Sequence, residues 1–291
     1  MYDTILVPTD GSEGAEAAAR HGLNLAAAFD SQIHFLSVVD ERSYSSALAD
    51  LDPTVGEQRE VFEQQATGAV ERLEELATDP SLTCHTAVEH GIAHEAIRSY
   101  AAEHDIDLIS MGTHGRTGLD RLLLGSVTER VVRTSDVPVL TARLEPDDSL
   151  SYDQILIPTD GSESATAAID HGIAIADRFD ATVHALSVVD VSAVAGAYDV
   201  GPGPDLFDSL EEGCERAVAA VEDECENRDV NIVTEVTRGT PYRGIQEYVD
   251  DENIDLVTMG THGRTGLERY LIGSVTERTV RTSDVPVLTV K

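Results

Sequence analysis

The chain has 291 residues, of which 41% are hydrophobic and 25% charged, and its formal net charge is −34. This composition is typical of a globular protein, and the length predicts about two domains. So acidic a surface repels nucleic acid and anionic membranes, which argues against both as partners. Lys291 is the only lysine. Acid-rich, lysine-poor surfaces are typical of salt-adapted (halophilic) proteins, and an ordinary acidic protein is the alternative.

Three cysteines, Cys84, Cys214 and Cys225, show no metal-binding spacing. We expect free thiols in a reducing compartment. No signal peptide is recognisable because a strand-like segment begins at residue 4, and every apolar run is too short to span a membrane. The sequence therefore predicts a soluble, cytoplasmic protein.

The second half of the chain repeats the first. YDTILVPTDGSE at residues 2–13 recurs as YDQILIPTDGSE at 152–163. A glycine-rich stretch at 111–141, which begins MGTHGRTGL, recurs at 259–289. Such self-similarity indicates a duplicated domain. We predict one domain at 1–144, a short polar linker at 145–151 and a second domain at 152–291.

In the first repeat, short apolar runs alternate with segments of helical periodicity. Residues 4–10 form a predicted strand that ends in Pro8, Thr9 and Asp10. Ser12 is a plausible cap of the helix that follows and reaches Phe29. The remaining predicted strands lie at 32–40, near 82–88, at 106–111 and at 137–142. The remaining predicted helices lie at 62–77, near 93–103 and at 126–134. This alternation predicts an α/β fold with a parallel sheet covered on both faces.

The second repeat follows the same order. Its predicted strands lie near 154–158, 182–189, 230–236, 255–259 and 285–290. The polar residues 40–54 are expected to be irregular, and the glycine- and proline-containing segment 193–205 is expected to form a flexible flap.

Each repeat places glycines between its fourth strand and the following helix. They are Gly112, Gly115 and Gly125, repeated as Gly260, Gly263 and Gly273. A strand, a glycine-rich loop and a helix start form a common phosphate-binding arrangement, because backbone amides point at the anion. The hydroxyl groups of Ser126 and Thr128 are expected to add donors.

A second loop, PTDG, follows the first strand of each repeat. Ligands of open α/β sheets bind at the carboxyl ends of the strands. If the first and fourth strands are neighbours, Asp10 and Gly112 face the same crevice. Asp10 and its repeat Asp160 would then hold a divalent cation such as magnesium, or a ribose hydroxyl. A carboxylate that interacts with the helix dipole is the alternative.

Two further residues of the glycine-rich loop have two interpretations each. His114 and its repeat His262 are either exposed loop residues or phosphate or metal contacts. Arg116 and its repeat Arg264 either steer phosphate or are solvated loop charges.

Signatures of catalysis are missing from the sequence. It contains no GxxxxGK[ST], GxSxG or HExxH pattern, and no pair of nucleophile and base is recognisable. His21 and His171 lie inside the first predicted helix of each repeat and are assigned to packing or to the surface.

The spacing Gly-x2-Gly-x9-Gly-Ser, which starts at Gly112 and Gly260, resembles the ATP-binding signature of the universal stress protein family. PTDGSE and SDVPVL are also similar to that family, and the resemblance covers nearly the whole chain, once per repeat. It implies two open-twisted five-stranded parallel sheets of order 3-2-1-4-5, flanked by helices. This is an adenine nucleotide alpha hydrolase-like fold with an ATP pocket in each repeat.

Carried over residue by residue, the resemblance implies a set of nucleotide contacts in each repeat. In the first repeat they are Pro8, Thr9, Asp10, Val38, Gly112, Thr113, His114, Gly115, Arg116, Gly125, Ser126, Val127 and Thr128. In the second they are Pro158, Thr159, Asp160, Val188, Gly260, Thr261, His262, Gly263, Arg264, Gly273, Ser274, Val275 and Thr276. Val38 and Val188 would contact adenine through their backbone. The loops at 40–54 and 190–207 match no family pattern.

The resemblance also implies a partner surface. Family members commonly dimerise through the fifth strand, and an unpaired fifth strand would be an exposed edge. We therefore expect 137–142 and 285–290 to pair within one chain as a pseudo-dimer, which leaves further homo-oligomers open.

Three functions are compatible with these patterns. The leading one is a stress-response or signalling protein that binds ATP, with or without magnesium, and does not turn it over rapidly. The second is a slow ATPase or nucleotidyl transferase that uses Asp10 and a divalent ion. The third is a structural dimerisation module with empty pockets. AMP or a cyclic nucleotide could replace ATP, since the adenine contacts would be shared.

Overall fold

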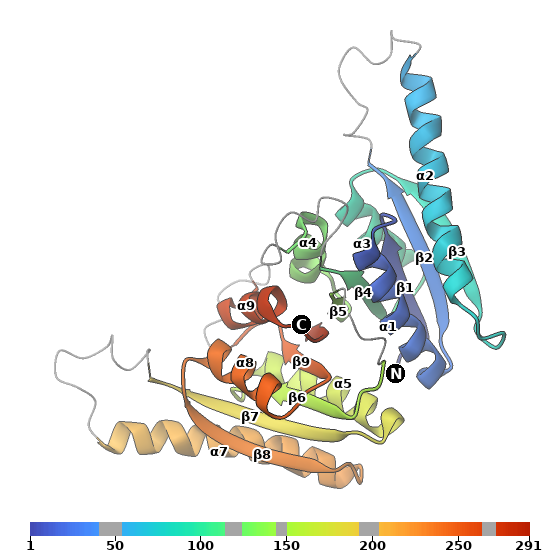
Figure 1. Ribbon diagram of the computed structural model, residues 1–291. Helices are drawn as coiled ribbons and strands as arrows, with labels where there is room; N and C mark the ends of the chain where they lie inside the picture. The colour runs from blue at the N-terminus through green and yellow to red at the C-terminus, as the bar shows by residue number, and fades with distance from the viewer. Residues whose placement is uncertain (41–53, 114–123, 144–149, 192–203, 264–271) are drawn as a thin grey trace. The chain divides into compact units, whose positions relative to one another are not determined.

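The computed structural model describes residues 1–40, 54–113, 124–143, 150–191, 204–263 and 272–291 (Figure 1). Its contacts divide into two compact units, Met1–Leu150 and Ser151–Lys291. The predicted linker at 145–151 lies mostly outside the described residues. No helix in the described ranges is long and apolar enough to cross a membrane.

Unit 1 is a five-stranded parallel sheet with the strand order β3-β2-β1-β4-β5. The predicted order 3-2-1-4-5 is therefore confirmed. Its elements are β1 (Thr4–Thr9), α1 (Glu13–Phe29), β2 (Gln32–Val39), α2 (Thr54–Leu76), β3 (Cys84–His90), α3 (Ala93–Glu103), β4 (Leu108–Gly112), α4 (Ser126–Thr134) and β5 (Val139–Ala142).

Unit 2 repeats this order as β8-β7-β6-β9-β10. Its elements are β6 (Gln154–Pro158), α5 (Glu163–Phe179), β7 (Thr182–Asp190), α7 (Pro204–Asn227), β8 (Ile232–Gly239), α8 (Pro241–Asp251), β9 (Leu256–Gly260), α9 (Ser274–Thr282) and β10 (Val287–Val290).

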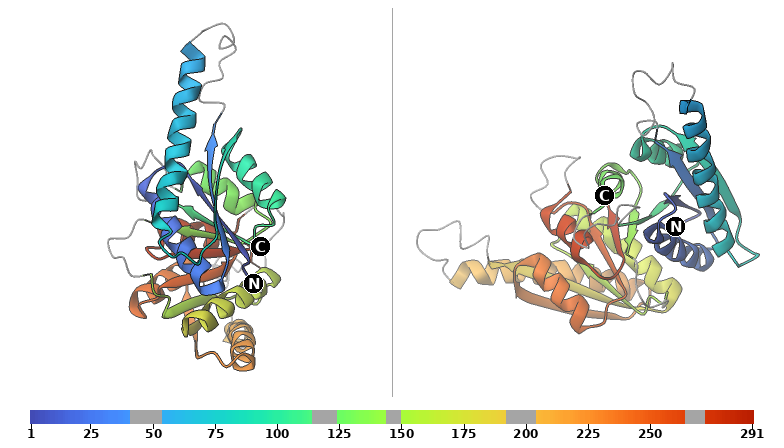
Figure 2. Two further views of the ribbon diagram at one scale, coloured as in Figure 1. Left: turned by 90° about the vertical axis from the view of Figure 1, so that its right-hand side faces the viewer. Right: turned by 45° about the horizontal axis from the view of Figure 1, so that its top comes forward.

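Helices cover both faces of each sheet. In unit 1, α1 packs beside α2 on one face and α3 beside α4 on the other (Figures 1 and 2). In unit 2, α5 and α7 form one layer and α8 and α9 the other. The central strands β1 and β6 are buried almost throughout, which explains their unbroken apolar sequences.

The first helix of each unit begins and ends at residues suited to those positions. The Ser12 hydroxyl accepts a hydrogen bond from the Ala15 amide at 3.3 Å, so the predicted cap is confirmed. Asp30 ends the helix in the left-handed conformation, with a φ of 57°. Ser162 and Asp180 do the same for α5.

Two helices begin differently from their predicted positions. α2 begins at Thr54, although its apolar periodicity starts only at Phe62. Residues 59–61 are exposed, with Val61 at 49%, so they give no apolar periodicity from which this part of the helix could be predicted. α7 begins at Pro204, inside the predicted flap at 193–205. Proline suits the first turn of a helix because its missing amide needs no partner there. The rest of that flap lies outside the described residues, as do residues 41–53.

The described side chains also confirm the assignments of His21 and the cysteines. His21 is buried in α1, and its repeat His171 is half-buried in α5. The three cysteines are free thiols, two of them buried.

Burial of His21 gives the protein a predictable sensitivity to acid. Burial lowers the pKa of this imidazole from its ordinary value of 6.5 to about 4. Between these two values the unfolded chain binds more protons than the folded chain, so the free energy of unfolding falls as the pH falls. This one group should remove about 2 kcal/mol by about pH 5. Urea unfolding of wild type and His21→Gln at both ends of this range measures the effect. An equal loss of stability in the variant would show that His21 is not responsible.

Candidate functional site

The loops after the first and fourth strands of each unit lie side by side. β1 pairs with β4, and β6 pairs with β9. Since parallel strands end at the same edge, PTDG and the start of the glycine-rich loop meet there. A Cβ atom on Gly112 would lie 2.5 Å from the Gly14 carbonyl oxygen, and one on Gly260 would lie 2.6 Å from the Ser164 carbonyl carbon. Only glycine allows this approach.

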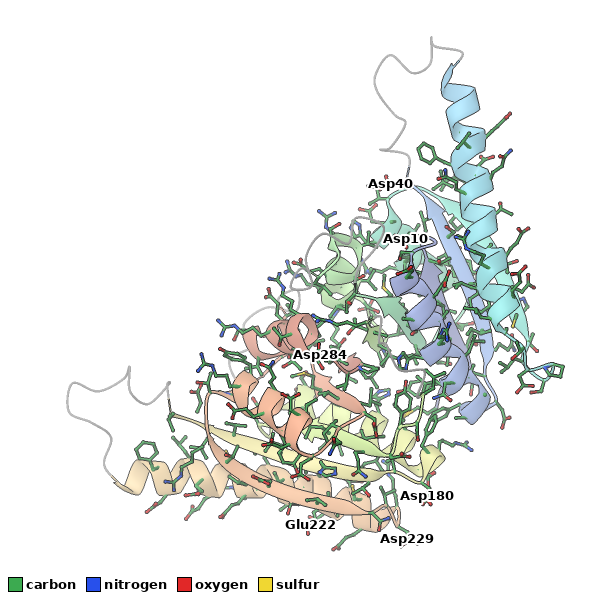
Figure 3. All side chains as sticks on the ribbon, in the orientation of Figure 1. Asp10, Asp40, Asp180, Glu222, Asp229 and Asp284 are labelled. Atoms are coloured by element: carbon green, nitrogen blue, oxygen red, sulfur yellow. The ribbon has the colours of Figure 1, made fainter. Side chains whose placement is uncertain are left out.

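Hydrogen bonds within the loop fix PTDG in unit 1. The Thr9 hydroxyl accepts from the Gly11 amide at 3.0 Å, and Asp10 Oδ1 accepts from the Ser12 amide at 3.1 Å. Gly11 has a φ of 78°, a conformation that favours glycine. The buried Ser37 hydroxyl donates to the Thr9 carbonyl at 3.0 Å. Asp10 itself is exposed at the carboxyl end of β1 (Figure 3).

Unit 2 repeats this loop and adds a contact between the two loops. Asp160 Oδ1 accepts from the Ser162 amide at 3.0 Å. Its other oxygen, Oδ2, lies 2.8 Å from where a Cβ of Gly263 would be. The Asp160 carboxylate therefore borders the glycine-rich loop, as the sequence predicts for one crevice. The helix-start interpretation alone does not account for this second contact.

The helix after the glycine-rich loop begins without a side-chain cap. Gly125 is the N-cap of α4 and has no side chain to bond the first amides. The Gly125 amide donates to the Thr113 carbonyl at 2.7 Å, and the Thr128 hydroxyl donates to the Gly112 carbonyl at 2.8 Å. Thr128 therefore holds the loop in place, and its hydroxyl proton is not directed at a ligand. Ser126 is exposed and keeps its hydroxyl at the helix start.

The same arrangement begins α9 in unit 2. Gly273 is the N-cap without a side-chain bond, and the Thr276 hydroxyl donates to the Gly260 carbonyl at 2.8 Å. Ser274 is exposed, as its counterpart is in unit 1. Both units thus present uncapped helix amides, which suit an anion.

His262 is not the exposed loop residue that one interpretation of the sequence suggested. It is half-buried, and its amide donates to the Ser164 hydroxyl at 3.2 Å. Its Nδ1 lies 2.9 Å from the Thr261 hydroxyl, and its Nε2 is buried without a partner among the described residues. A buried nitrogen of this kind needs a hydrogen-bond partner. His114, Gly115, Arg116 and Arg264 lie outside the described residues.

The remaining predicted contacts occupy the same edge of the sheets. Pro8 and Pro158 are buried in the central strands, and the half-buried Val38 and Val188 lie near the ends of β2 and β7. Val127 and Val275 are half-buried in the first turns of α4 and α9.

Two contacts of the site were not predicted from the sequence. Ser37 and its repeat Ser187 donate hydrogen bonds to the carbonyls of Thr9 and Thr159. The available signal was a serine within an otherwise apolar run, LSVV in both repeats. Arg72 of α2 donates to the Gly11 carbonyl at 3.5 Å, and no local pattern links residues so far apart in sequence.

A metal ion at this edge would need ligands beyond the protein side chains. In the described part of the chain, no group of three or more His, Cys, Asp or Glu side chains is placed to hold one. Magnesium commonly uses one or two carboxylates with phosphate oxygens and water. Asp10 and Asp160, each at the open end of a central strand, fit that role.

Comparisons with known proteins agree with the fold and the repeat. The universal stress protein family model matches residues 1–143 and 151–291. A universal stress protein of Methanocaldococcus jannaschii is 43% identical over 140 residues, which cover 48% of this chain and 82% of that protein. One from Mycolicibacterium smegmatis is 27% identical over 301 residues, which cover 99% of this chain and 96% of that protein. The crystal structure of a universal stress protein from Archaeoglobus fulgidus has the same fold, with a TM-score of 0.71 at 21% identity over 100% of this chain and 99% of that one.

Proposed function

The chain belongs to the universal stress protein family in its tandem form, and from this premise we propose that each unit binds one ATP molecule. The proposed contacts are the two sets named from the sequence, at the carboxyl ends of β1 and β4 and of β6 and β9. Thr128 and Thr276 would contribute their backbone amides, because their hydroxyls donate to the carbonyls of Gly112 and Gly260. Binding without rapid turnover is the proposed activity, in a stress-response or signalling role.

The uncapped helix start beside the glycine-rich loop supports this proposal most directly. In unit 1 the amides of Ser126, Val127 and Thr128 begin α4 without a side-chain cap, because the N-cap residue is Gly125. Gly112, at the start of the glycine-rich loop, is held against the start of α1 before a ligand arrives. A preorganised set of amides loses little entropy when it binds an anion.

The expected affinity follows from the number of donors. A hydrogen bond to a charged group contributes about 1.5–3 kcal/mol. Desolvation and ordering offset part of this gain. Four or five such bonds are then compatible with a micromolar dissociation constant, which corresponds to a binding free energy of about −8 kcal/mol. Each of these carboxylates, Asp10 in unit 1 and Asp160 in unit 2, would repel the triphosphate bound in its own unit unless a cation lay between carboxylate and phosphate. We therefore propose that magnesium accompanies ATP.

A thermal-shift titration tests binding, and ADP formation tests turnover. If ATP binds the folded units, saturation at about 100 times the dissociation constant stabilises each by about 2.7 kcal/mol. An unchanged melting temperature would instead support the structural module with empty pockets. Steady ADP formation that stops in Asp10→Ala with Asp160→Ala would support the slow ATPase or nucleotidyl transferase. AMP and a cyclic nucleotide serve as competing ligands.

We also propose that β5 and β10 pair within one chain, as the family resemblance implies. A charge placed on this interface should open it, because burying an unpaired charge costs several kcal/mol. Leu140→Glu with Leu288→Glu is therefore expected to increase the radius of gyration measured by small-angle X-ray scattering. Val233→Glu, at a site 44% exposed on β8, is the control and should leave the radius unchanged. Equal radii in all three proteins would contradict the pairing.

We also propose a cytoplasmic location. The acid-rich, lysine-poor composition supports a separate proposal, adaptation to high salt. Binding is therefore best measured at high ionic strength, where repulsion among the acidic residues is screened. A protein that is equally stable in low salt would contradict the salt adaptation.

A further inference from the structure

Three histidines and a tyrosine meet in unit 1, away from the proposed nucleotide site. His34 of β2 is 8% exposed, and its Nδ1 lies 2.9 Å from the Tyr100 hydroxyl of α3. Its ring centroid lies 4.6 Å from that of His85 on β3 and 5.5 Å from that of His104, which ends α3. The Tyr100 and His104 centroids are 4.0 Å apart. We call these four residues the histidine cluster.

The histidine cluster lies near the amino-terminal ends of its strands. His34 is the third residue of β2, and its neighbour in the register, His85, is the second of β3. Asp10 and the glycine-rich loop follow the carboxyl ends of strands. The cluster is thus separate from the residues proposed to bind ATP, and it connects the end of α3 to the β2–β3 edge of the sheet.

Unit 2 provides a natural comparison. His184 and Tyr248 form the same pair, again at 2.9 Å, and His184 Nε2 also lies 2.7 Å from Gln154 Oε1. In unit 2, Val233 of β8 occupies the position that corresponds to His85. Glu252, which ends α8, occupies the position that corresponds to His104. Unit 2 therefore keeps the buried histidine–tyrosine pair and replaces both flanking imidazoles with an apolar and an acidic residue.

These surroundings affect the two buried histidines differently. Burial, together with the positive charges that His85 and His104 can carry, lowers the pKa of His34 to about 4. Burial also lowers the pKa of His184, but the Glu252 carboxylate raises it. The acidic residue of unit 2 thus partly compensates for burial, and unit 1 has no such compensation at this position.

The other neighbours of His34 do not supply a compensating charge. On β1 its register partner is the apolar Leu6. On α3 the titratable neighbour besides the histidine is Tyr100, whose pKa is raised by burial and by the charge of Glu89. That carboxylate does not contribute to the pKa shift of His34.

We propose that the histidine cluster is an acid-sensitive latch that holds α3 on the β2–β3 edge while His34 is neutral and releases it when His34 becomes protonated. Unit 2, with Val233 and Glu252, stays closed over the same range. Histidine suits such a switch because its ordinary protonation range lies near neutral pH. The latch does not depend on ATP binding. β2 also carries Val38 near its other end. Release of α3 would therefore loosen a strand that the proposed nucleotide pocket uses.

The direction of the effect follows from proton linkage. Between about pH 6.5 and pH 4 the released state binds more protons at His34 than the closed state does. The equilibrium therefore shifts toward release as the pH falls. We expect the equilibrium constant between the closed and released states to change about tenfold by about pH 5. This is less than the pKa of His34 alone would give, because water screens the exposed His85 and His104.

Hydrogen–deuterium exchange of the full chain tests the latch, with α8 as the reference for α3 in the same sample. After correction for the intrinsic exchange rate, protection of Ala93–Glu103 should fall about tenfold relative to Pro241–Asp251 between about pH 7.5 and pH 5. The double variant His85→Val, His104→Glu carries the unit 2 residues in unit 1 and should abolish this difference. The reciprocal variant Val233→His, Glu252→His should give α8 the same acid sensitivity.

Each outcome decides for or against the latch. Equal loss of protection in α3 and α8 of the wild type would overturn it. So would an acid effect on α3 relative to α8 that survives in the double variant, because the flanking imidazoles would then not be its source. If the double variant already opens α3 near neutral pH, the reciprocal variant decides alone, and an α8 that gains no acid sensitivity contradicts the proposal.

Discussion

Replacing Gly112 or Gly260 with alanine is expected to abolish ATP binding in the affected unit and to lower its stability by about 1–3 kcal/mol. The new methyl group would lie 2.5 Å from the Gly14 carbonyl oxygen in unit 1 and 2.6 Å from the Ser164 carbonyl carbon in unit 2. These are backbone atoms at the start of α1 and α5, so neither can yield without moving the helix. The glycine-rich loop must then shift away from the helix start that it positions.

Gly68 provides the matched control for these substitutions. It is a half-buried glycine within α2, and a Cβ there would have nothing within 4 Å. Gly68→Ala should stabilise unit 1 by about 0.5–1 kcal/mol, because alanine is the better helix former, and should leave binding unchanged. Calorimetric titration with ATP and denaturant unfolding of each variant provide the two measurements. Wild-type affinity in Gly112→Ala would show that the loop position does not determine binding.

Replacing Asp10 and Asp160 with asparagine is expected to weaken ATP binding about tenfold to a hundredfold when magnesium is present. An amide cannot supply the negative charge that magnesium requires, whereas its oxygen can still bond a ribose hydroxyl. Without magnesium the loss should be much smaller, because removal of the carboxylate also removes its repulsion of the triphosphate.

Asparagine is preferable to alanine here because it leaves the loop intact. Its oxygen can still accept the Ser162 amide, as Asp160 Oδ1 does at 3.0 Å. Asp180→Asn is the control, since Asp180 ends α5 with a φ of 54° that asparagine also tolerates (Figure 3). Equal losses with and without magnesium would show that the aspartates contribute to binding without the cation. No loss under either condition would contradict the magnesium role and leave at most a ribose contact, which asparagine preserves.

Much of the fold could be predicted because local sequence and tertiary structure agree. Ser12 caps α1 as its position before the apolar periodicity predicts. The buried runs of β1 and β4 read as strands because both faces of a parallel sheet are covered. The edge strand β3 is displaced from its predicted position near 82–88, because its half-exposed residues show no clear alternation.

Contacts between distant segments explain what could not be predicted. The sequence suggested that Thr128 offers its hydroxyl to phosphate, whereas the hydroxyl donates to the Gly112 carbonyl. The His262 amide donates to the Ser164 hydroxyl of α5, and no local pattern links residues so far apart in sequence. The histidine cluster likewise joins β2, β3 and the end of α3, and no motif marks those residues as neighbours.

Calorimetric titration of the intact chain with ATP and magnesium in high salt tests the proposed function most directly. Two sites per chain with dissociation constants near micromolar, about −8 kcal/mol each, are the predicted result. One site should disappear in Gly112→Ala and the other in Gly260→Ala. No heat of binding, together with an unchanged melting temperature at saturating ATP, would contradict nucleotide binding as the function of this protein.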